Sequence, residues 1–396
     1  MTKRTLPCRI RLIVLLLVCQ QALPLQADSL NRTLAANFNS FFQRHVEAEG
    51  ITGAAFVIAT PDGIVLTGVA GHTDTSHSRR IDENTAFRIA SVSKTFAAGL
   101  TGLLVQEGRL SWDDRLIDHL PDFRIDGDSS QVRILHLLGQ STGLIPHAYD
   151  NLIEDGLPLE KIQEKYRNLS YICSPGECYS YQNSIFSLIE PVIEKTTAQT
   201  YAQLMEDRIF RPLDMRTASV GHEPFVSNPN HAKPHVKSGK GWKTVSVKPN
   251  YYRVAPAAGI NASALDLGKW LSAQMGGKPA VVDPSLVETL IQPRVETVRD
   301  MRRKYWRDLL SEAHYGLGWR IYRLGAHEIA YHSGWVSGYR ADLAWSGEGD
   351  IGIAVLMNVE SNSISELTTT FWRMAFEEQA PGSAATPRVA AGLPPP

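Results

Sequence analysis

The stretch Phe87-Arg88-Ile89-Ala90-Ser91-Val92-Ser93-Lys94 stands at the head of an apolar pattern with helical spacing. The apolar positions of that pattern are Val92, Phe96, Leu100, Leu103 and Leu104, and Gly108 marks its end. The pattern predicts a helix over residues 92–107. Residues three apart share one helix face, so the Lys94 amine is predicted to reach the Ser91 hydroxyl. The positive end of the helix also favours negative charge that develops at Ser91.

Ser91 and Lys94 form the only S-x-x-K pattern in the chain, and this pattern suits nucleophilic catalysis. A serine hydroxyl is a poor nucleophile until a neighbouring group takes its proton. A lysine can take that proton only where desolvation or nearby charge lowers its pKa. The same two residues also fit a capping serine followed by a surface lysine, so the pattern alone does not establish catalysis.

Two further motifs follow along the chain. Tyr181-Gln182-Asn183 comes after the turn residues Ser174-Pro175-Gly176 and before a helical pattern over residues 184–195. His332-Ser333-Gly334 ends a predicted strand, and Trp335 follows it. A strand that ends in small residues lets its backbone approach a substrate closely.

The ordered set S-x-x-K, Y-x-N and [KH]-[TS]-G resembles the motif order of class C β-lactamases, related DD-carboxypeptidases and family VIII esterases. These proteins belong to the serine β-lactamase and penicillin-binding-protein superfamily. The stretches 87–91, 137–144 and 258–263 are similar to that superfamily as well, and the resemblance covers about residues 30–378. Each motif alone is unspecific, whereas the three in this order are highly specific.

The resemblance implies a role for each matching residue of the first two motifs. Ser91 resembles the acylated nucleophile, Lys94 its activating partner and Tyr181 the second proton-transfer group. Asn183 is similar to a residue that contacts the substrate amide or the lysine. Whether Lys94 or Tyr181 is the general base stays open, because the base is disputed in related enzymes.

The resemblance also implies that the third motif binds substrate. His332 lies where the cation of the triplet binds a substrate carboxylate or supports Tyr181, and Ser333 and Gly334 complete the triplet. The backbone N–H groups of Ser91 and Trp335 would form the oxyanion hole.

Two positions depart from the pattern of the β-lactamases. The triplet begins with His332 instead of the usual lysine, which resembles certain DD-carboxypeptidases. Trp335 stands where a small polar residue is common, and we expect it to narrow or reshape the acyl pocket. Both departures argue against an efficient antibiotic-hydrolysing enzyme.

Strand patterns lie near both ends of the chain, at residues 54–59, 64–70, 316–322, 328–332, 339–345 and 351–358. Thr60-Pro61-Asp62-Gly63 joins the first two as a hairpin. Helical patterns lie at residues 30–48, 92–107, 132–138, 184–195, 264–271 and 363–378. This order predicts an α+β fold of the β-lactamase and transpeptidase type. One antiparallel sheet from both chain ends is flanked by helices, with a large, mostly helical inserted region.

Residues 28–380 are therefore predicted to form one serine hydrolase domain. Its sheet part takes about residues 28–85 and 310–380, and its helical part takes about residues 86–309. The tail at residues 381–396 is rich in proline and small residues, which predicts disorder.

Residues 1–27 have the pattern of a secretory signal peptide. Basic residues precede a short apolar run at residues 12–18, and small residues follow at Ala22 and Ala27. The run is too short to span a bilayer, so we expect an exported chain, periplasmic or secreted, without a transmembrane segment once mature. Lipoprotein anchoring through Cys19 is less favoured, because Val18 is bulkier than such signals usually tolerate.

Cys173 and Cys178 remain after removal of the signal. Four residues with a Pro-Gly turn separate them, which can bring the two Cα atoms within disulfide reach. The spacing is not that of a C-x-x-C metal or redox pair, and an oxidising compartment favours a disulfide bond between them.

Other classes of function are disfavoured. A net charge of -1 gives no reason to expect nucleic acid as a partner. Pro234 between His231 and His235 prevents a zinc pair on one helix face, and we predict no metal and no other cofactor. Ser141 lies in a G-x-S-x-G pattern, but a predicted helix precedes it where that motif requires a strand.

The predicted reaction is acyl transfer to water through an acyl-Ser91 intermediate. The expected substrate is a small molecule or peptidoglycan fragment with an amide or β-lactam bond. A carboxylic-ester hydrolase on the same scaffold is the alternative. A penicillin-binding sensor that deacylates slowly is another.

Overall fold

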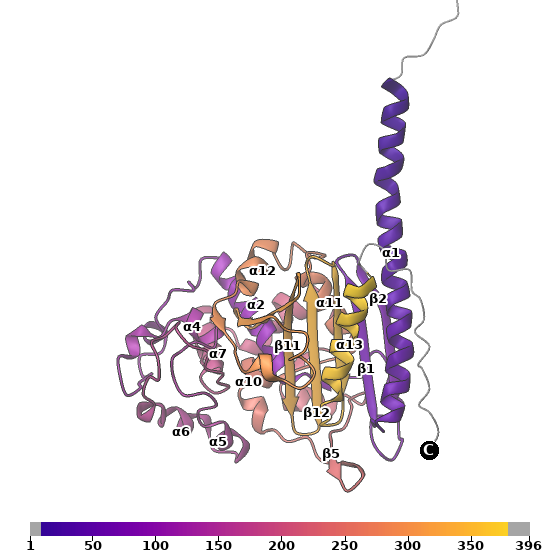
Figure 1. The fold of residues 1–396 in the computed structure, drawn as a ribbon. Helices are drawn as coiled ribbons and strands as arrows, with labels where there is room; N and C mark the ends of the chain where they lie inside the picture. Colours follow the sequence, from indigo (N-terminus) through magenta and orange to yellow (C-terminus); the bar gives the residue numbers. More distant parts are fainter. Residues whose placement is uncertain (1–8, 379–396) are drawn as a thin grey trace, which may run out of the picture.

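The computed structural model describes residues 9–378, of which residues 9–28 and 377–378 are described by their backbone alone. α1 (Arg9–Ala48) is one helix, and Figure 1 shows its N-terminal part extending past the body of the molecule. The first eight residues of the predicted signal and the predicted disordered tail at 381–396 lie outside the described residues. Among those described, no helix has the length and apolar character needed to cross a membrane.

An eight-stranded antiparallel sheet forms the centre of the fold, in the order β2-β1-β13-β12-β11-β10-β9-β8. Its strands are β1 (Gly53–Thr60), β2 (Gly63–Gly71), β8 (Val295–Glu296), β9 (Glu312–Tyr315), β10 (Arg320–Leu324), β11 (His327–Val336), β12 (Tyr339–Ser346) and β13 (Ile351–Met357). β1 pairs with β13, with Phe56 opposite Val355, so strands from both chain ends meet in one sheet. This confirms the predicted α+β fold class.

The strand predicted over residues 316–322 is shorter than expected, and β9 before it was missed. Gly316 N–H donates to the carbonyl oxygen of Trp319 (2.8 Å), which makes residues 316–319 the turn between β9 and β10. Gly318 has φ +75°, which glycine adopts without strain. Leu317 and Trp319 are fully buried in this turn, which explains why the alternating apolar pattern continues through it.

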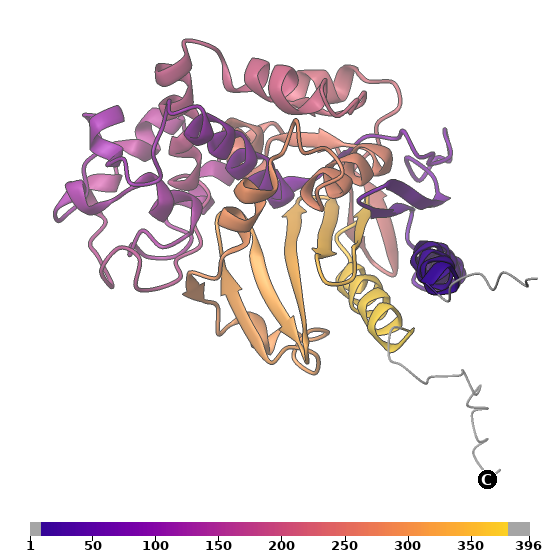
Figure 2. The ribbon, with the colours of Figure 1, turned by 90° about the horizontal axis from the view of Figure 1, so that it is seen from above.

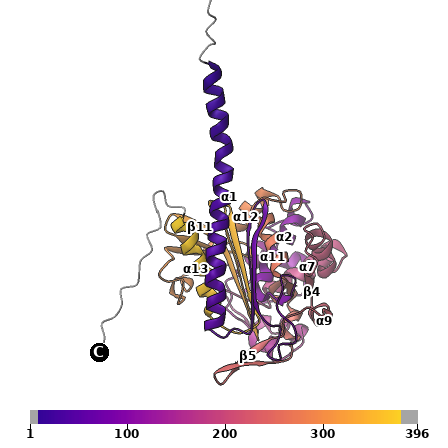
Figure 3. The ribbon, with the colours of Figure 1, turned by 90° about the vertical axis from the view of Figure 1, so that its right-hand side faces the viewer.

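Helices cover both faces of the sheet, as Figures 1 and 3 show. α1 and α13 (Ser363–Glu378) cover one face, while α2 (Ser93–Gln106) and α11 (Ala264–Gln274) lie on the other. Phe38 of α1 packs edge-on against Phe56 (5.0 Å between ring centroids) and Phe371 (5.5 Å). Val57, on the opposite side of β1, belongs to the core that α2 and α11 share. Burial of both faces explains why β1 is apolar throughout.

The chain between β2 and β8 forms the helical region, which lies beside the sheet in Figure 2. Besides α2 and α11, its helices are α3 (Leu116–His119), α4 (Ile134–Leu138), α5 (Asp150–Glu154), α6 (Leu159–Gln163), α7 (Ile189–Thr197), α8 (Tyr201–Met205), α9 (His222–Ser227), α10 (Ala255–Ala258) and α12 (Pro284–Ile291). A small sheet of β3 (Phe87–Arg88), β7 (Ile260–Ala262) and β4 (Ser219–Val220) joins distant segments, and β5 (His235–Ser238) pairs with β6 (Gly241–Thr244).

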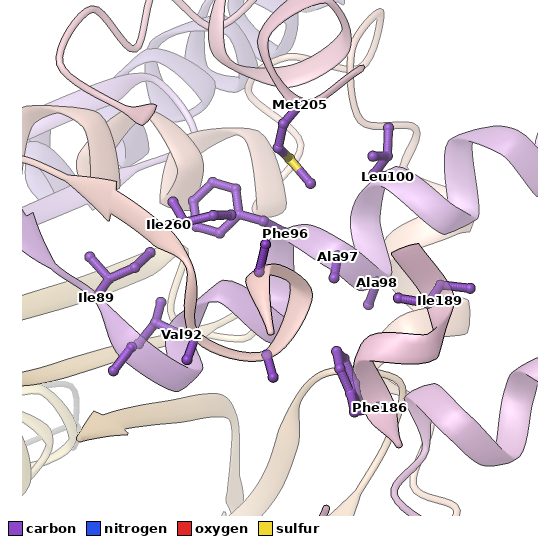
Figure 4. Packing of buried hydrophobic residues seen from close by; sticks show 14 of the residues in the cluster. Ile89, Val92, Phe96, Ala97, Ala98, Leu100, Phe186, Ile189, Met205 and Ile260 are labelled. Atoms are coloured by element: carbon purple, nitrogen blue, oxygen red, sulfur yellow. The ribbon is translucent and has the colours of Figure 1, made fainter. Parts of the chain in front are cut away.

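α2 runs through the middle of this region, and nearly all of its residues are buried. Its Phe96 stacks on Trp270 of α11, with 4.3 Å between ring centroids, and Figure 4 shows Phe96 among the apolar side chains around it. Trp270 also donates through Nε1 to Thr95 Oγ1 (3.1 Å). These contacts fix the helix that follows Ser91, and its bounds agree with the predicted helix over residues 92–107.

Candidate active site

Ser91 lies in the 3-10 turn Ala90–Val92 that leads into α2. β3 pairs with β7 just before this turn, and Ile89 N–H donates to the Ile260 carbonyl oxygen (3.2 Å). Ala90 has a left-handed backbone with φ 49°, which costs a non-glycine residue free energy and recurs at functional sites. The turn holds the partly buried Ser91 side chain at the N-terminal end of α2.

The Lys94 amine is fully buried and has three oxygen neighbours. Its Nζ lies 3.3 Å from Ser91 Oγ and donates to Asn183 Oδ1 (2.8 Å) and to the Ala257 carbonyl oxygen (3.0 Å). An uncharged amine has two N–H bonds and one lone pair. With both N–H bonds used by Asn183 and Ala257, the lone pair is left for the Ser91 hydroxyl.

The surroundings of Lys94 favour this uncharged form. Burial lowers the pKa of Lys94 well below its ordinary value, and the positive charge of Arg320 acts in the same direction. The negative charge of Asp150 opposes them. Lys94 is therefore placed to accept the proton of Ser91.

Tyr181 lies against both residues of the pair. Lys94 Nζ lies 4.7 Å from the centroid of the Tyr181 ring, and the Ser91 hydroxyl is near enough to the Tyr181 hydroxyl to lower its pKa. Burial raises the pKa of Tyr181 to about 12, although the Ser91 hydroxyl and the Arg320 charge oppose the increase. At neutral pH the phenol keeps its proton and can donate it.

The segment around Tyr181 is fastened to the loop after α4. His147 N–H donates to the Tyr181 carbonyl oxygen (2.7 Å), and Gln182 N–H donates to Gln140 Oε1 (2.7 Å). Ser141, the serine of the G-x-S-x-G pattern, is buried in that loop, and its carbonyl oxygen accepts from Gly176 N–H (2.7 Å). The stretch 137–144 therefore holds the second motif in place.

Cys173 and Cys178 form a disulfide bond, with 6.3 Å between their Cα atoms, as predicted from their spacing. The bridge closes the turn that contains Gly176, directly before the Tyr181 motif.

Two residues that the motif analysis missed continue the chain of contacts beyond Asn183. Asn183 Nδ2 donates to Asp150 Oδ2 (2.8 Å), and His147 Nδ1 lies 2.9 Å from the same oxygen. The Asp150 side chain is 14% exposed and that of His147 is 59% exposed. The only sequence signal was their spacing of three residues in a loop, which is common in ordinary surface turns.

His332 is fully buried, and both ring nitrogens have partners. Nδ1 lies 3.0 Å from the Ser333 carbonyl oxygen and Nε2 lies 3.1 Å from the Tyr315 hydroxyl. A neutral ring fits both contacts, because Nδ1–H donates to the carbonyl and Nε2 accepts from the phenol. Burial lowers the pKa of His332 well below its ordinary value, and the charge of Arg320 adds to the decrease.

Arg320 supplies a buried positive charge that the motif analysis did not identify. Its guanidinium carbon lies 5.6 Å from the centroid of the Tyr181 ring and 5.7 Å from those of Tyr179 and Tyr315. It forms an ion pair with Asp300, and the two side chains are 12% and 10% exposed. A lone arginine inside the strand predicted over residues 316–322 gives no sequence signal for such a position.

The other residues of the third motif divide between the two faces of β11. Alternation along the strand places Gly334 on the face of Ser91 and places Ser333 on the opposite face. A Cβ atom at residue 334 would collide with the Ile89 carbonyl oxygen, so glycine lets β11 approach the Ser91 turn. Ser333 Oγ instead lies near Arg303 Nη2 (3.5 Å).

Trp335 follows the triplet on the same face as Ser333. Its side chain is 61% exposed, and the guanidinium carbon of Arg340 lies 4.6 Å from the ring centroid. The indole therefore lies on the surface of the protein, and its effect on the acyl pocket stays a prediction. Its backbone N–H stays the predicted second donor of the oxyanion hole.

Comparisons with known proteins agree with this geometry. The family model described as Beta-lactamase matches residues 38–371. Protein flp of Staphylococcus aureus (strain MW2) is 24% identical over 340 residues, which cover 83% of this chain and 64% of that protein. Protein flp of strain N315 is 24% identical over 328 residues, covering 80% of this chain and 61% of that protein. The chain thus spans less than two thirds of the length of these curated relatives.

Solved structures share the fold at low sequence identity. The octameric penicillin-binding protein homologue from Pyrococcus abyssi has a TM-score of 0.76 at 23% identity, covering 86% of this chain and 77% of that chain. EstCE1, a hydrolase with promiscuous acyltransferase activity, has a TM-score of 0.72 at 17% identity, covering 87% and 99%. A D-stereospecific amidohydrolase from Streptomyces sp. has a TM-score of 0.67 at 20% identity, covering 88% and 99%. The family match over most of the chain shows that the protein belongs to the Beta-lactamase family.

Proposed function

We propose that the protein hydrolyses carboxylic esters or amides through an acyl-Ser91 intermediate, with Lys94 as the general base. The position of the Lys94 amine carries this proposal. It is buried, lies 3.3 Å from Ser91 Oγ, and has acceptors for both N–H bonds of its neutral form.

Acylation then proceeds as follows. Ser91 Oγ attacks the carbonyl carbon and its proton passes to Lys94 Nζ, while the carbonyl electrons move to the oxygen. The N–H groups of Ser91 and Trp335 stabilise this oxyanion. The bond to the leaving group breaks as Tyr181 donates its phenolic proton to that group. Lys94 returns the proton to Tyr181, so the site regains its original protonation.

Deacylation uses the same groups with water in place of Ser91. Water attacks the acyl carbon and gives a proton to Lys94. The bond between the acyl carbon and Ser91 Oγ then breaks, and Ser91 Oγ recovers a proton through Tyr181. The product is a carboxylic acid.

The state of His332 narrows the class of substrate. A neutral, fully buried imidazole with both nitrogens partnered offers no cation to a substrate carboxylate. Arg320 is already paired with Asp300. These observations favour an ester or amide without a carboxylate beside the scissile bond.

The second candidate is a peptidoglycan-like amide or a β-lactam, both of which carry such a carboxylate. The observation that favours it is the permanent charge of Arg320, 5.6 Å from the Tyr181 ring centroid. Similarity to a penicillin-binding protein homologue is in keeping with it. A sensor that acylates without turnover is a third outcome of the experiment below.

The experiment is intact-mass analysis and burst kinetics with a short-chain p-nitrophenyl ester, an uncharged peptide amide and a chromogenic cephalosporin. We expect rapid turnover of the ester and loss of covalent labelling by a fluorophosphonate in Ser91→Ala. Ser141→Ala serves as the control and should label normally. Labelling that persists in Ser91→Ala would refute the assignment, and stoichiometric labelling by the cephalosporin without turnover would show a sensor.

We also propose that the chain is exported. The N-terminal pattern of a secretory signal motivates this, and the Cys173–Cys178 disulfide is typical of an oxidising compartment. N-terminal sequencing of the protein from its native host should show cleavage near residue 27.

A further inference from the structure

A continuous chain of contacts leads from the nucleophile to the surface of the helical region. It runs from Ser91 to Lys94 (3.3 Å), from Lys94 to Asn183 (2.8 Å), from Asn183 to Asp150 (2.8 Å), and from Asp150 to His147 (2.9 Å). The last two residues belong to the loop before α5 and its first turn, outside all three motifs.

Asp150 determines which way the Asn183 amide faces. Its Oδ2 is an acceptor only, so it fixes the NH2 group of Asn183 toward itself and leaves the amide oxygen toward Lys94. An amide turned the other way would point N–H bonds at the Lys94 amine, and the amine would lose an acceptor. The orientation of the group next to Lys94 thus depends on a carboxylate that does not contact Lys94 directly.

The loop that carries Asp150 is held in an unusual conformation. His147 and Tyr149 both have left-handed backbones, with φ 58° and φ 61°. Such residues cost free energy and persist where surrounding contacts fix them. His147 supplies two of those contacts, through its N–H to the Tyr181 carbonyl oxygen and through Nδ1 to Asp150.

Asp150 also acts through its charge. It raises the pKa of Lys94 and, as a smaller contribution, that of Tyr181. Three other charged or titratable groups face Lys94, namely Arg320, Tyr181 and His332. The groups that face Asp150 are His147, Tyr166, Tyr181 and Tyr251. Asp150 is the one carboxylate among these groups.

We propose that Asp150 and His147 are positioning residues for the acyl-transfer reaction, with Asp150 acting as the counter-charge of Lys94 and as the anchor of Asn183. This inference rests on the proposed function of Ser91. According to this inference, Asp150 and His147 set the pH range over which Ser91 reacts. It needs no contact between either residue and the substrate.

The test is the pH dependence of Ser91 modification by an uncharged fluorophosphonate, followed by intact mass. In Asp150→Asn the shape is kept and the charge is lost, so Lys94 and Tyr181 both lose their protons more easily. The acid limb of the rate profile should move to lower pH by on the order of one unit, about a tenfold change in rate on that limb. This direction holds whichever of the two residues is the base.

Control variants separate charge from structure. Asp126→Asn removes an exposed carboxylate of the same region. The Asp126 side chain accepts a hydrogen bond from Ser170 Oγ, away from Lys94, so the rate profile of this variant should not move. Asp150→Ser removes the same charge with a smaller side chain and should move the limb in the same direction. His147→Asn retains a donor near the Nδ1 position and tolerates the left-handed backbone, so its maximal rate should stay within about threefold, whereas His147→Leu should lose about tenfold or more.

The outcomes are distinguishable. An acid limb that stays in place or moves to higher pH in both Asp150 variants would overturn this inference. Labelling of Ser91 in the unmodified protein would still support the proposed function in that case. Absence of Ser91 labelling in the unmodified protein would refute both.

Discussion

Arg320 and Asp300 form an ion pair that is almost completely withdrawn from solvent, at the side of the active site formed by tyrosine rings. A buried pair contributes little net stability, but removal of one partner leaves an uncompensated charge. The charge of Arg320 also opposes the increase in the pKa of Tyr181 and lowers the pKa of Lys94 and His332. One arginine outside the three motifs thus affects the charge state of three residues within them.

Arg320→Met should lower the free energy of unfolding by about 3–5 kcal/mol, because Asp300 is left buried and charged. Urea denaturation measures this loss. The double variant Arg320→Met with Asp300→Asn removes both charges and should recover most of it. Equal losses in the single and double variants would contradict this prediction, because they would show that the unpaired charge of Asp300 is not the cause of the loss.

The buried neutral state of His332 predicts a specific dependence of stability on pH. Its pKa in the folded protein is well below the ordinary value of 6.5, so the unfolded chain binds this proton at higher pH than the folded chain. The contribution of His332 to stability is complete above pH 6.5 and is lost as pH falls toward its folded pKa. His332→Gln should therefore lose less free energy of unfolding between about pH 7 and 5 than the unmodified protein. Equal losses would contradict the neutral state.

The same state predicts how substrates are distinguished. The acylation rates of a carboxylate-bearing substrate and an uncharged ester should follow the same pH profile between about pH 6 and 8, since His332 does not titrate there. Pre-steady-state acylation measures both profiles. A selective loss for the carboxylate-bearing substrate as pH rises would instead show that His332 binds it as a cation.

Lys94→Met should separate catalysis from stability. We expect acylation of Ser91 to fall by at least about 100-fold, because the proton acceptor is removed. The melting temperature should stay the same or rise, because an apolar chain replaces a buried amine. The matched control is Lys161→Met. Lys161 lies on α6 and forms an exposed ion pair with Glu164, so this variant should leave acylation unchanged. A variant of Lys94 with normal acylation would exclude it as the base.

Replacing both Cys173 and Cys178 by serine should lower the free energy of unfolding by less than about 3 kcal/mol, since the closed loop is short. The segment around Tyr181 is also held by His147 N–H, which donates to the Tyr181 carbonyl oxygen, and by Gln182 N–H, which donates to the Gln140 side chain. We therefore expect the turnover number to stay within about twofold. A larger fall would show that the bridge positions Tyr181.

Local sequence patterns were sufficient to predict the elements that depend on neighbouring residues. The apolar spacing after Ser91 determined α2, and Thr60-Pro61-Asp62-Gly63 determined the hairpin of β1 and β2. The neighbourhood of Ser91, Lys94, Tyr181 and Asn183 was implied by the resemblance of the three ordered motifs to a known superfamily. The helix and the hairpin could be predicted because periodicity, turn geometry and i,i+3 proximity depend only on residues near one another in the chain.

The charge states of the site depend on contacts between segments that lie far apart in the sequence. Lys94 meets Asn183 and Ala257 across 89 and 163 residues of sequence, and its neutral form depends on burial that those segments complete. The pairing of Arg320 with Asp300 and the contact of Asp150 with Asn183 likewise join separate segments. Desolvation and Coulomb interactions depend on distance in space, so no local pattern around Arg320, Asp150 or His332 could show which of them carries charge at the site.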